Sequence, residues 1–191
     1  MTNAFFRRMI RKSTRSATLL TLFLAAAFAC KQSNVTQKDP ELVYIDSLEN
    51  AMKLATEKNP AEPDLNLAMY LAKAYQNYEA GHPNDSLSPK FLFKAGQVVE
   101  NVFDDKQRAA ELYFMIYKKY PKSGSAPYAL FMTGNLFHTV KDTAHAVEML
   151  EFFMAKYPDH KLKMDAAALI KSLGVEPDTS SRPVKDMPFS S

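Results

Sequence analysis

Few side chains in this 191-residue chain are placed to carry chemistry, and their spacing matches no catalytic or metal-binding motif. No two of the four histidines are four residues apart, the spacing that would place two metal ligands on one helix face. The sequence contains no GxSxG motif, no P-loop and no HExxH motif. Asp104 and Asp105 resemble an acid–base pair, but a helix N-cap accounts for Asp105. We therefore expect no enzyme, no metal site and no cofactor.

Cys30 is the only cysteine, which excludes an intrachain disulfide and a zinc site built on cysteines. It follows a basic segment, 1–16, and an apolar segment, 17–29. An apolar segment of this length spans roughly 20 Å as a helix, less than the ~30 Å hydrocarbon core of a bilayer. We therefore expect a signal peptide rather than a permanent membrane helix.

The positive charge of the chain comes from its first 30 residues. The whole sequence has 24 Lys and Arg and 21 Asp and Glu, but five of the basic residues and none of the acids precede position 30. The remaining chain therefore has 19 basic and 21 acidic residues, a net charge of −2. This balance gives no support for a nucleic-acid partner.

A repeated phrase indicates which elements make up the rest of the chain. The phrase SPKFLFKAG begins at Ser88, and the similar phrase APYALFMTG begins 38 residues later, at Ala126. Each is followed by a second apolar segment that ends in Tyr-Pro, at Tyr120 and at Tyr157. Self-similarity at a period of this size predicts an all-α fold of antiparallel helix hairpins stacked as a short solenoid.

Apolar spacing and breaker residues predict seven helices, the last of which would cap the stack. Their expected ranges are 41–57, 65–80, 89–102, 106–119, 126–139, 143–156 and 160–173. The expected N-caps are Asp64, Ser88, Asp105, Asp142 and Asp159. Pro89 is expected at the first helical position, where its missing N–H has no cost.

Composition divides the chain into four segments. Residues 1–29 are the expected signal peptide, and residues 30–40 contain the cysteine and a polar tether. Residues 41–174 form the expected helical repeat domain. Residues 175–191 contain prolines, serines and charges with few apolar side chains, and we expect a disordered tail there.

The end of the apolar segment resembles the lipobox of bacterial lipoproteins, in which the cysteine becomes the lipidated first residue of the mature protein. The matching residues are Ala27-Phe28-Ala29-Cys30, followed at once by polar side chains. Two positions depart from the family, since Ala27 replaces the usual Leu and Phe28 is bulky. The resemblance implies several acyl chains on Cys30, and more than one chain is what stable anchoring requires. The alternative is a cysteine that lies by chance at a signal-peptidase site.

Residues 127–160 resemble a tetratricopeptide repeat, whose pattern has small residues at positions eight and twenty and Pro at thirty-two. These positions hold Gly134, Ala146 and Pro158. In the preceding unit they hold Gly96 and, after one inserted residue, Ala109 and Pro121. Small residues allow the two helices of a pair to approach closely. The period of 37–38 departs from the usual 34, and Ile116 or Phe153 fills position twenty-seven, which is small in the family. The turn at 120–127 resembles envelope repeat lipoproteins of the barrel-assembly and Tol-Pal coordinator type.

The tetratricopeptide resemblance implies a concave groove lined by the first helix of each pair, at repeat positions two, five, nine and twelve. On this chain those positions are Lys90, Phe93, Gln97, Glu100, Tyr128, Phe131, Asn135 and His138. Such a mixture of aromatic, amide and charged groups suits the binding of an extended peptide or a partner helix. The alternative is that these side chains are the solvated side of the stack, or are covered by the tail.

These features lead to one expectation of function and two alternatives. We expect a non-catalytic protein–protein interaction scaffold, lipid-anchored in the bacterial envelope at the periplasmic face of the outer membrane, as part of an assembly or secretion machine. Its partner would be an envelope protein or peptide, not a nucleic acid or a small-molecule substrate. The first alternative is an accessory subunit that presents a peptide or an unfolded outer-membrane protein to an enzyme or chaperone. The second is self-association through the exposed first helix or the end helix.

Overall fold

The computed structural model describes residues 39–178. The predictions for the signal peptide, for Cys30, for the tether up to residue 38 and for the tail beyond residue 178 lie outside the described residues. Within 39–178 the chain forms seven α-helices and no strand. These are α2 (Pro40–Lys58), α3 (Leu65–Gly81), α4 (Ser88–Asn101), α5 (Lys106–Lys119), α6 (Ala126–Thr139), α7 (Thr143–Lys156) and α8 (Lys163–Ser172).

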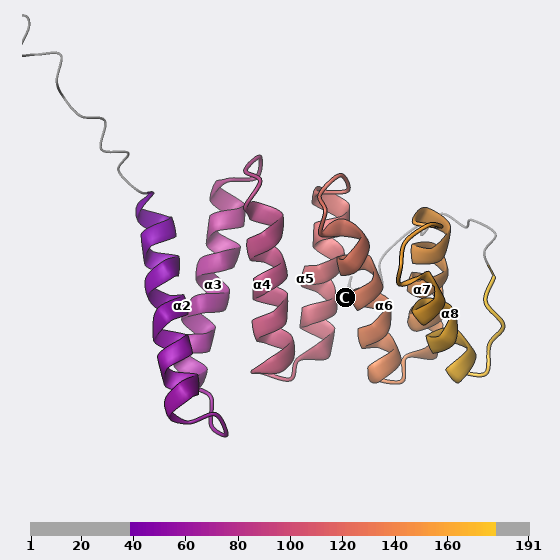
Figure 1. The fold of residues 1–191 in the computed structure, drawn as a ribbon, viewed down its shortest axis with the longest axis horizontal. Coiled ribbons are helices and arrows are strands. Elements are labelled where there is room, and N and C mark those ends of the chain that lie inside the picture. Colours follow the sequence, from indigo (N-terminus) through magenta and orange to yellow (C-terminus); the bar gives the residue numbers. More distant parts are fainter. Residues whose placement is uncertain (1–38, 179–191) are drawn as a thin grey trace, which may run out of the picture. The chain divides into compact units, whose positions relative to one another are not determined.

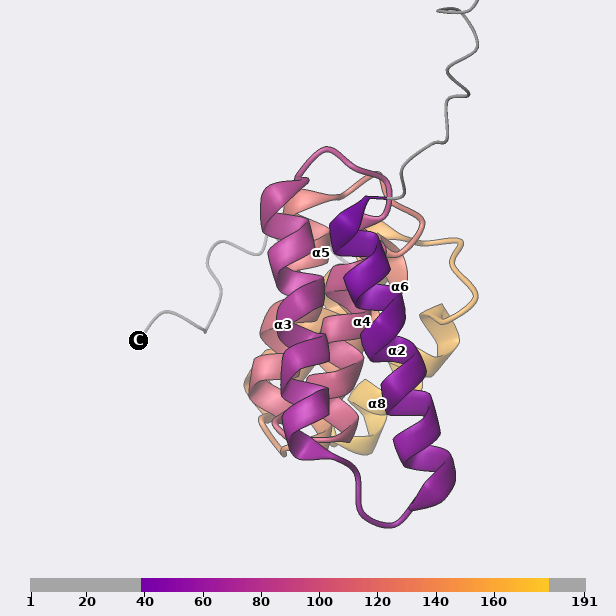
Figure 2. The same ribbon diagram turned by 90° about the vertical axis from the view of Figure 1, so that its left-hand side faces the viewer.

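Successive helices alternate in direction and pack against one another in chain order (Figure 1). The pairs α2–α3, α4–α5 and α6–α7 form three hairpins, and α8 packs against α7 and α6. Viewed from the start of the stack, α2 and α3 lie side by side in front of the later helices (Figure 2). The predicted fold class, an all-α solenoid of stacked helix hairpins, is confirmed.

Three of the predicted N-caps are confirmed by their hydrogen bonds. The carboxylates of Asp64, Asp105 and Asp142 each accept from the backbone N–H three residues later, at 3.0, 2.9 and 3.2 Å. Each bond satisfies one of the N–H groups that a helix start leaves without a partner. Helices α5, α6 and α7 begin and end at the predicted residues.

The predicted N-cap Ser88 is wrong, because α4 begins one residue earlier than expected. Ser88 is itself the first helical residue, Leu87 precedes it as the N-cap, and Pro89 therefore takes the second position. The Ser88 hydroxyl, fully buried, donates instead to the carbonyl of His82 at 2.5 Å. Its role is to close the linker between α3 and α4.

The predicted N-cap Asp159 is also wrong, since α8 begins at Lys163. The intervening residues form a turn in which Nδ1 of His160 accepts from the N–H of Leu162 at 3.2 Å. This turn has the same backbone hydrogen bond as the linkers before α4 and α6. In each case the N–H of the first residue of the helix donates to the carbonyl three residues earlier. The donor and acceptor pairs are Ser88 to Asp85, Ala126 to Ser123 and Lys163 to His160.

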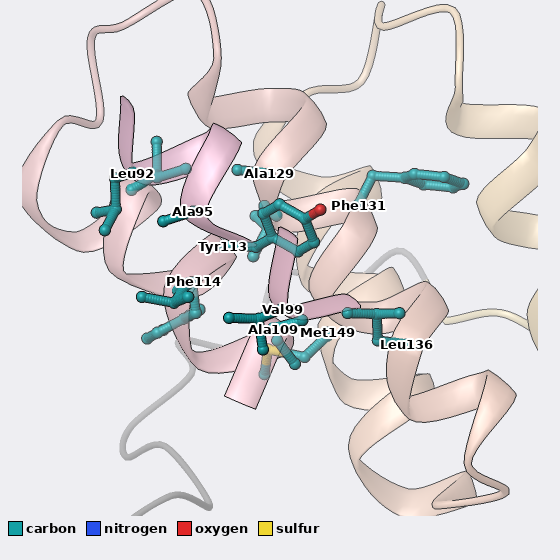
Figure 3. Packing of buried hydrophobic residues seen from close by; sticks show 14 of the residues in the cluster. Leu92, Ala95, Val99, Ala109, Tyr113, Phe114, Ala129, Phe131, Leu136 and Met149 are labelled. Atoms are coloured by element: carbon teal, nitrogen blue, oxygen red, sulfur yellow. The ribbon is translucent and has the colours of Figure 1, made fainter. Parts of the chain in front are cut away.

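Two of the predicted small residues, Gly96 and Gly134, lie at close contacts within the hairpins α4–α5 and α6–α7. A Cβ added to Gly134 would lie 2.7 Å from Leu150 Cγ and 3.2 Å from the backbone nitrogen of Leu150. A Cβ added to Gly96 would lie 2.6 Å from Tyr113 Cε1. Figure 3 shows Tyr113 in the middle of the core that runs along the stack. Close helix approach therefore accounts for both glycines.

Several tyrosines at the edge of the core donate their hydroxyls to carboxylates. The bonds run from Tyr75 to Glu49 at 2.6 Å, from Tyr113 to Glu100 at 2.8 Å, from Tyr120 to Glu79 at 2.6 Å and from Tyr78 to Asp85 at 2.9 Å. Burial, followed by the nearby carboxylate, raises the pKa of all four phenols, that of Tyr78 to about 12. These hydroxyls therefore stay neutral donors across the physiological pH range.

Candidate functional site

The predicted groove residues occupy α4 and α6, four on each helix, and differ in exposure. Lys90, Gln97 and Tyr128 are exposed, and Tyr128 has 43% of its surface open to solvent. Phe93, Glu100, Asn135 and His138 are partly buried, whereas Phe131 is 9% exposed. The prediction therefore combines surface residues with residues of the core.

Aromatic rings connect α4 and α6 across this part of the stack. The Phe93 ring centroid lies 5.5 Å from that of Tyr128 on α6 and 4.9 Å from that of Tyr113 on α5. Tyr128 in turn lies 6.4 Å from Phe131, with the two rings stacked. The result is a row of rings in which Phe93 is partly covered and Tyr128 faces solvent.

Three of the predicted residues make contacts within the protein. Phe131 packs its ring edge-on against Phe153, with 5.6 Å between the centroids. Glu100 accepts the hydroxyl of Tyr113, and Nε2 of His138 lies 2.7 Å from Oγ of Ser172 on α8. Core packing and side-chain hydrogen bonds account for these three side chains, and we define the site by the other five, of which Phe93 and Asn135 are partly buried.

We call these five residues the α4–α6 face: Lys90, Phe93, Gln97, Tyr128 and Asn135. Gln97 is one helical turn after Phe93, and Asn135 is two turns after Tyr128, so each amide shares a helix side with an aromatic ring. An aromatic pair flanked by amide groups can pack against an apolar side chain and hydrogen-bond to an extended backbone.

The titratable groups of the described residues were compared with what a metal site needs. Within 39–178 no three His, Cys, Asp or Glu side chains lie close enough to hold a metal ion. The closest His–carboxylate pair is His145 and Asp142, with 2.6 Å between Nδ1 and Oδ2. The hydrogen bond from His145 lowers the pKa of Asp142, which also caps α7. Helix capping accounts for this pair.

Sequence reasoning missed an ion pair between a buried carboxylate on α3 and a half-exposed lysine on α5. Glu79 is 4% exposed, and its carboxylate oxygens lie 2.9 and 3.1 Å from Nζ of Lys119. The same carboxylate accepts the hydroxyl of Tyr120 at 2.6 Å. The available signal was the position of Glu79 four residues after Tyr75, on the buried side of α3. Its partner could not be inferred, because it lies 40 residues later.

Sequence reasoning also missed a cavity of about 760 Å³ between the linkers 82–87 and 120–125. Its lining includes Lys90, Lys119 and Lys122, which come from two helices and a linker. The available signal was the composition of the second linker, 120–125, in which small Ser and Gly residues follow Pro121 and Lys122.

Comparison with protein-family models and with curated proteins gives no match for this chain. The helices of the described part do not include one that is long and apolar enough to cross a membrane. The tetratricopeptide and lipobox resemblances therefore stay predictions, and the helical solenoid is the established level of description.

Proposed function

We propose that this protein is a non-catalytic binding scaffold of the tetratricopeptide type, lipid-anchored through Cys30 in the bacterial cell envelope. In this proposal the α4–α6 face holds a protein partner of an outer-membrane assembly or secretion machine. The observation that carries it is the ring pair Phe93 and Tyr128, which lies 5.5 Å apart on neighbouring hairpins and is partly open to solvent.

The ring pair has the properties of an interface anchor. The Tyr128 ring is in contact with the rings of both Phe93 and Phe131, so little side-chain freedom is lost when a partner covers it. Aromatic residues that are rigid before binding are enriched among the side chains that dominate interface energies. The amides of Gln97 and Asn135 would give the hydrogen bonds that set the register of an extended partner segment.

The anchoring part of the proposal rests on the sequence. A basic segment, an apolar segment and a single cysteine followed by polar residues form the order expected of a lipoprotein leader. A scaffold tethered in this way would hold its partner close to the membrane. The polar segment 31–38 would provide the slack between the lipid and α2.

The scaffold is tested by isolating the protein with its partner from cells and measuring stoichiometry. Tyr128→Ala should reduce the recovered partner about thirtyfold, since truncation of a central aromatic anchor typically costs about 2 kcal/mol or more. Lys118→Ala on α5 is the matched surface control and should leave recovery unchanged. Equal recovery with both variants would contradict the assignment of the face, and many substoichiometric unfolded chains would favour substrate presentation instead.

The anchor is tested separately by replacing the lipidation site. Cys30→Ser should release the protein into the soluble periplasm or leave it unprocessed, because no acyl chain can be attached. Cell fractionation and the mass of the mature chain provide the measurement. Unchanged membrane retention at the mass of an unlipidated chain would contradict the lipoprotein assignment.

A further inference from the structure

One end of the solenoid is formed by the three linkers 82–87, 120–125 and 157–162, and we call it the linker end (Figure 1). The cavity of about 760 Å³ lies between the first two of these linkers. A volume of this size accommodates a small organic group rather than a single ion. The cavity is separate from the ring pair of the α4–α6 face, although Lys90 borders both.

The described lining of the cavity has more positive than negative charge. Lys90 and Lys122 are exposed and form no ion pair with another described residue, whereas Lys119 is engaged by Glu79. Asp85 is the one acid among the described lining residues, and its oxygens accept from Tyr78 and from the N–H of Leu87. Neither lysine forms an ion pair with Asp85, and with three lysines to one carboxylate the described lining keeps a net positive charge, as a site for an anion requires.

The second linker also lacks an acceptor that the other two linkers have. In the first linker Asp85 accepts the N–H two residues later, and in the third His160 does the same. Ser123 holds the equivalent position in the second linker, but its Oγ has no hydrogen-bond partner and no such bond is formed. Rotation of the Ser123 side chain toward the cavity would therefore break no bond, and an anion there would supply the missing acceptor.

Charge is distributed unequally between the two ends of the stack. At the linker end, 81–90, 119–126 and 156–163 contain six lysines and two aspartates, with Glu79 paired to Lys119 and with Asp39 and Glu41 beside His82, so basic residues outnumber acids six to five. At the opposite end, 57–64, 101–106 and 139–143 contain three lysines and six acids. The linker end is therefore the one attracted to an anionic surface.

The chain enters the solenoid at this same end. Glu41, in the first turn of α2, lies 3.4 Å from Nε2 of His82 in the first linker. Cys30 precedes Asp39 by nine residues, which span at most about 30 Å when fully extended. With the lipid anchor of the proposed function, on which this step rests, the chain that leads from the anchor joins the solenoid at the linker end and holds Asp39 within about 30 Å of the bilayer.

We propose that the linker end docks on the membrane and that its cavity receives the phosphate of an anionic lipid headgroup. Lys90 and Lys122 supply the ammonium groups, and Ser123 and the N–H of Ser125 supply further donors. The cavity would hold the phosphate together with the polar head beyond it. Docking fixes the orientation of the solenoid, so that the α4–α6 face is presented at a constant height above the bilayer.

The test is partition of the full chain into vesicles of phosphatidylglycerol and phosphatidylcholine, compared with vesicles of phosphatidylcholine alone. Replacing Lys90 and Lys122 by Gln should weaken binding to the anionic vesicles about thirtyfold, the equivalent of two lysines near the surface. The matched control replaces Lys58 and Lys141, at the opposite end, by Gln and removes the same charge. All variants carry the same apolar leader, so its contribution cancels when the partition coefficient of a variant is divided by that of the original chain. Equal partition of both double variants would overturn the proposal.

Two further arms separate the lipid from a free phosphate and from the anchor. The first arm measures binding of glycerol 3-phosphate. If this phosphate binds at the same lysines while the protein shows no preference for anionic over neutral vesicles, the ligand is a soluble organic phosphate and the lipid assignment is overturned. The full chain with Cys30→Ser should keep the thirtyfold difference, because the linker end itself recognises the headgroup. Loss of that difference would overturn docking, whereas release of Cys30→Ser in cells tests the anchor alone.

Discussion

Gly134 offers the sharpest test of how the hairpins pack. A Cβ at this position would lie 2.7 and 2.9 Å from Cγ and Cδ2 of Leu150 and 3.2 Å from the backbone nitrogen of Leu150. Carbon atoms in contact are normally about 3.5–4.0 Å apart, so one added methyl group requires α6 and α7 to separate. Leu150 is fully buried, so a movement of its side chain would displace other core residues.

The expected magnitudes follow from this geometry. Overpacking costs about 1–3 kcal/mol, and the better helix propensity of Ala or Leu returns about 1 kcal/mol. Gly134→Ala should therefore lose about 1 kcal/mol of unfolding free energy. Gly134→Leu adds three more carbons in the same place and should lose about 3 kcal/mol, which lowers Tm by about 6–12 °C.

Urea unfolding followed by far-UV circular dichroism measures these losses, with the midpoint expected to fall at an unchanged slope. Gly124→Ala is the matched control, because an added Cβ there meets no heavy atom within 4 Å, and its stability should not decrease. A Gly134→Leu variant with the stability of the original chain would refute the close approach of α6 and α7 at this residue.

Three further predictions concern other parts of the described structure. The free energy of unfolding should not depend on the tyrosines below pH 10 and should fall as the pH rises from about 10 towards 12. The reason is that the folded-state pKa of Tyr78 is raised to about 12, so the unfolded chain releases this proton at lower pH than the folded chain. Denaturant midpoints measured against pH test this, and no such fall would mean that the phenols titrate normally. Lys141→Gly should stabilise the protein by up to about 1 kcal/mol because Lys141 has a φ of 64°, and a loss in thermal unfolding would contradict a strained turn. Ser88→Ala should cost about 1 kcal/mol through loss of the bond to the His82 carbonyl, and an unchanged Tm would show that this bond does not stabilise the linker.

Local signals in the sequence were sufficient for most of the fold. Asp105 and Asp142 start their helices as caps, and the bounds of α5, α6 and α7 follow from cap, periodicity and breaker residues. The start of α8 was predicted wrongly because Asp159 has the chemistry of a cap but lies inside a turn. The repeat period alone would have given the correct start of α8, because Lys163 lies 37 residues after Ala126, the first residue of α6.

The candidate site was less predictable because exposure depends on residues that are distant in sequence. The repeat position of Phe131 predicted an accessible side chain on the groove side of α6. In the structure, contacts with Phe153 and Tyr128 bury it. The pairing of Glu79 with Lys119 requires two hairpins to be stacked before either partner is identifiable. A cavity between linkers likewise depends on how the hairpins are spaced, which periodicity does not specify.

The measurement that tests the scaffold most directly is photo-crosslinking in cells from a photoreactive residue at Tyr128, with Lys118 as the control position. Tyr128 is preferable to Phe131, whose replacement would disturb the core. The account predicts one discrete adduct from Tyr128 and none from Lys118, and its mass would identify the partner. The same adducts from both positions, or no adduct from Tyr128, would contradict a partner-binding face on α4 and α6.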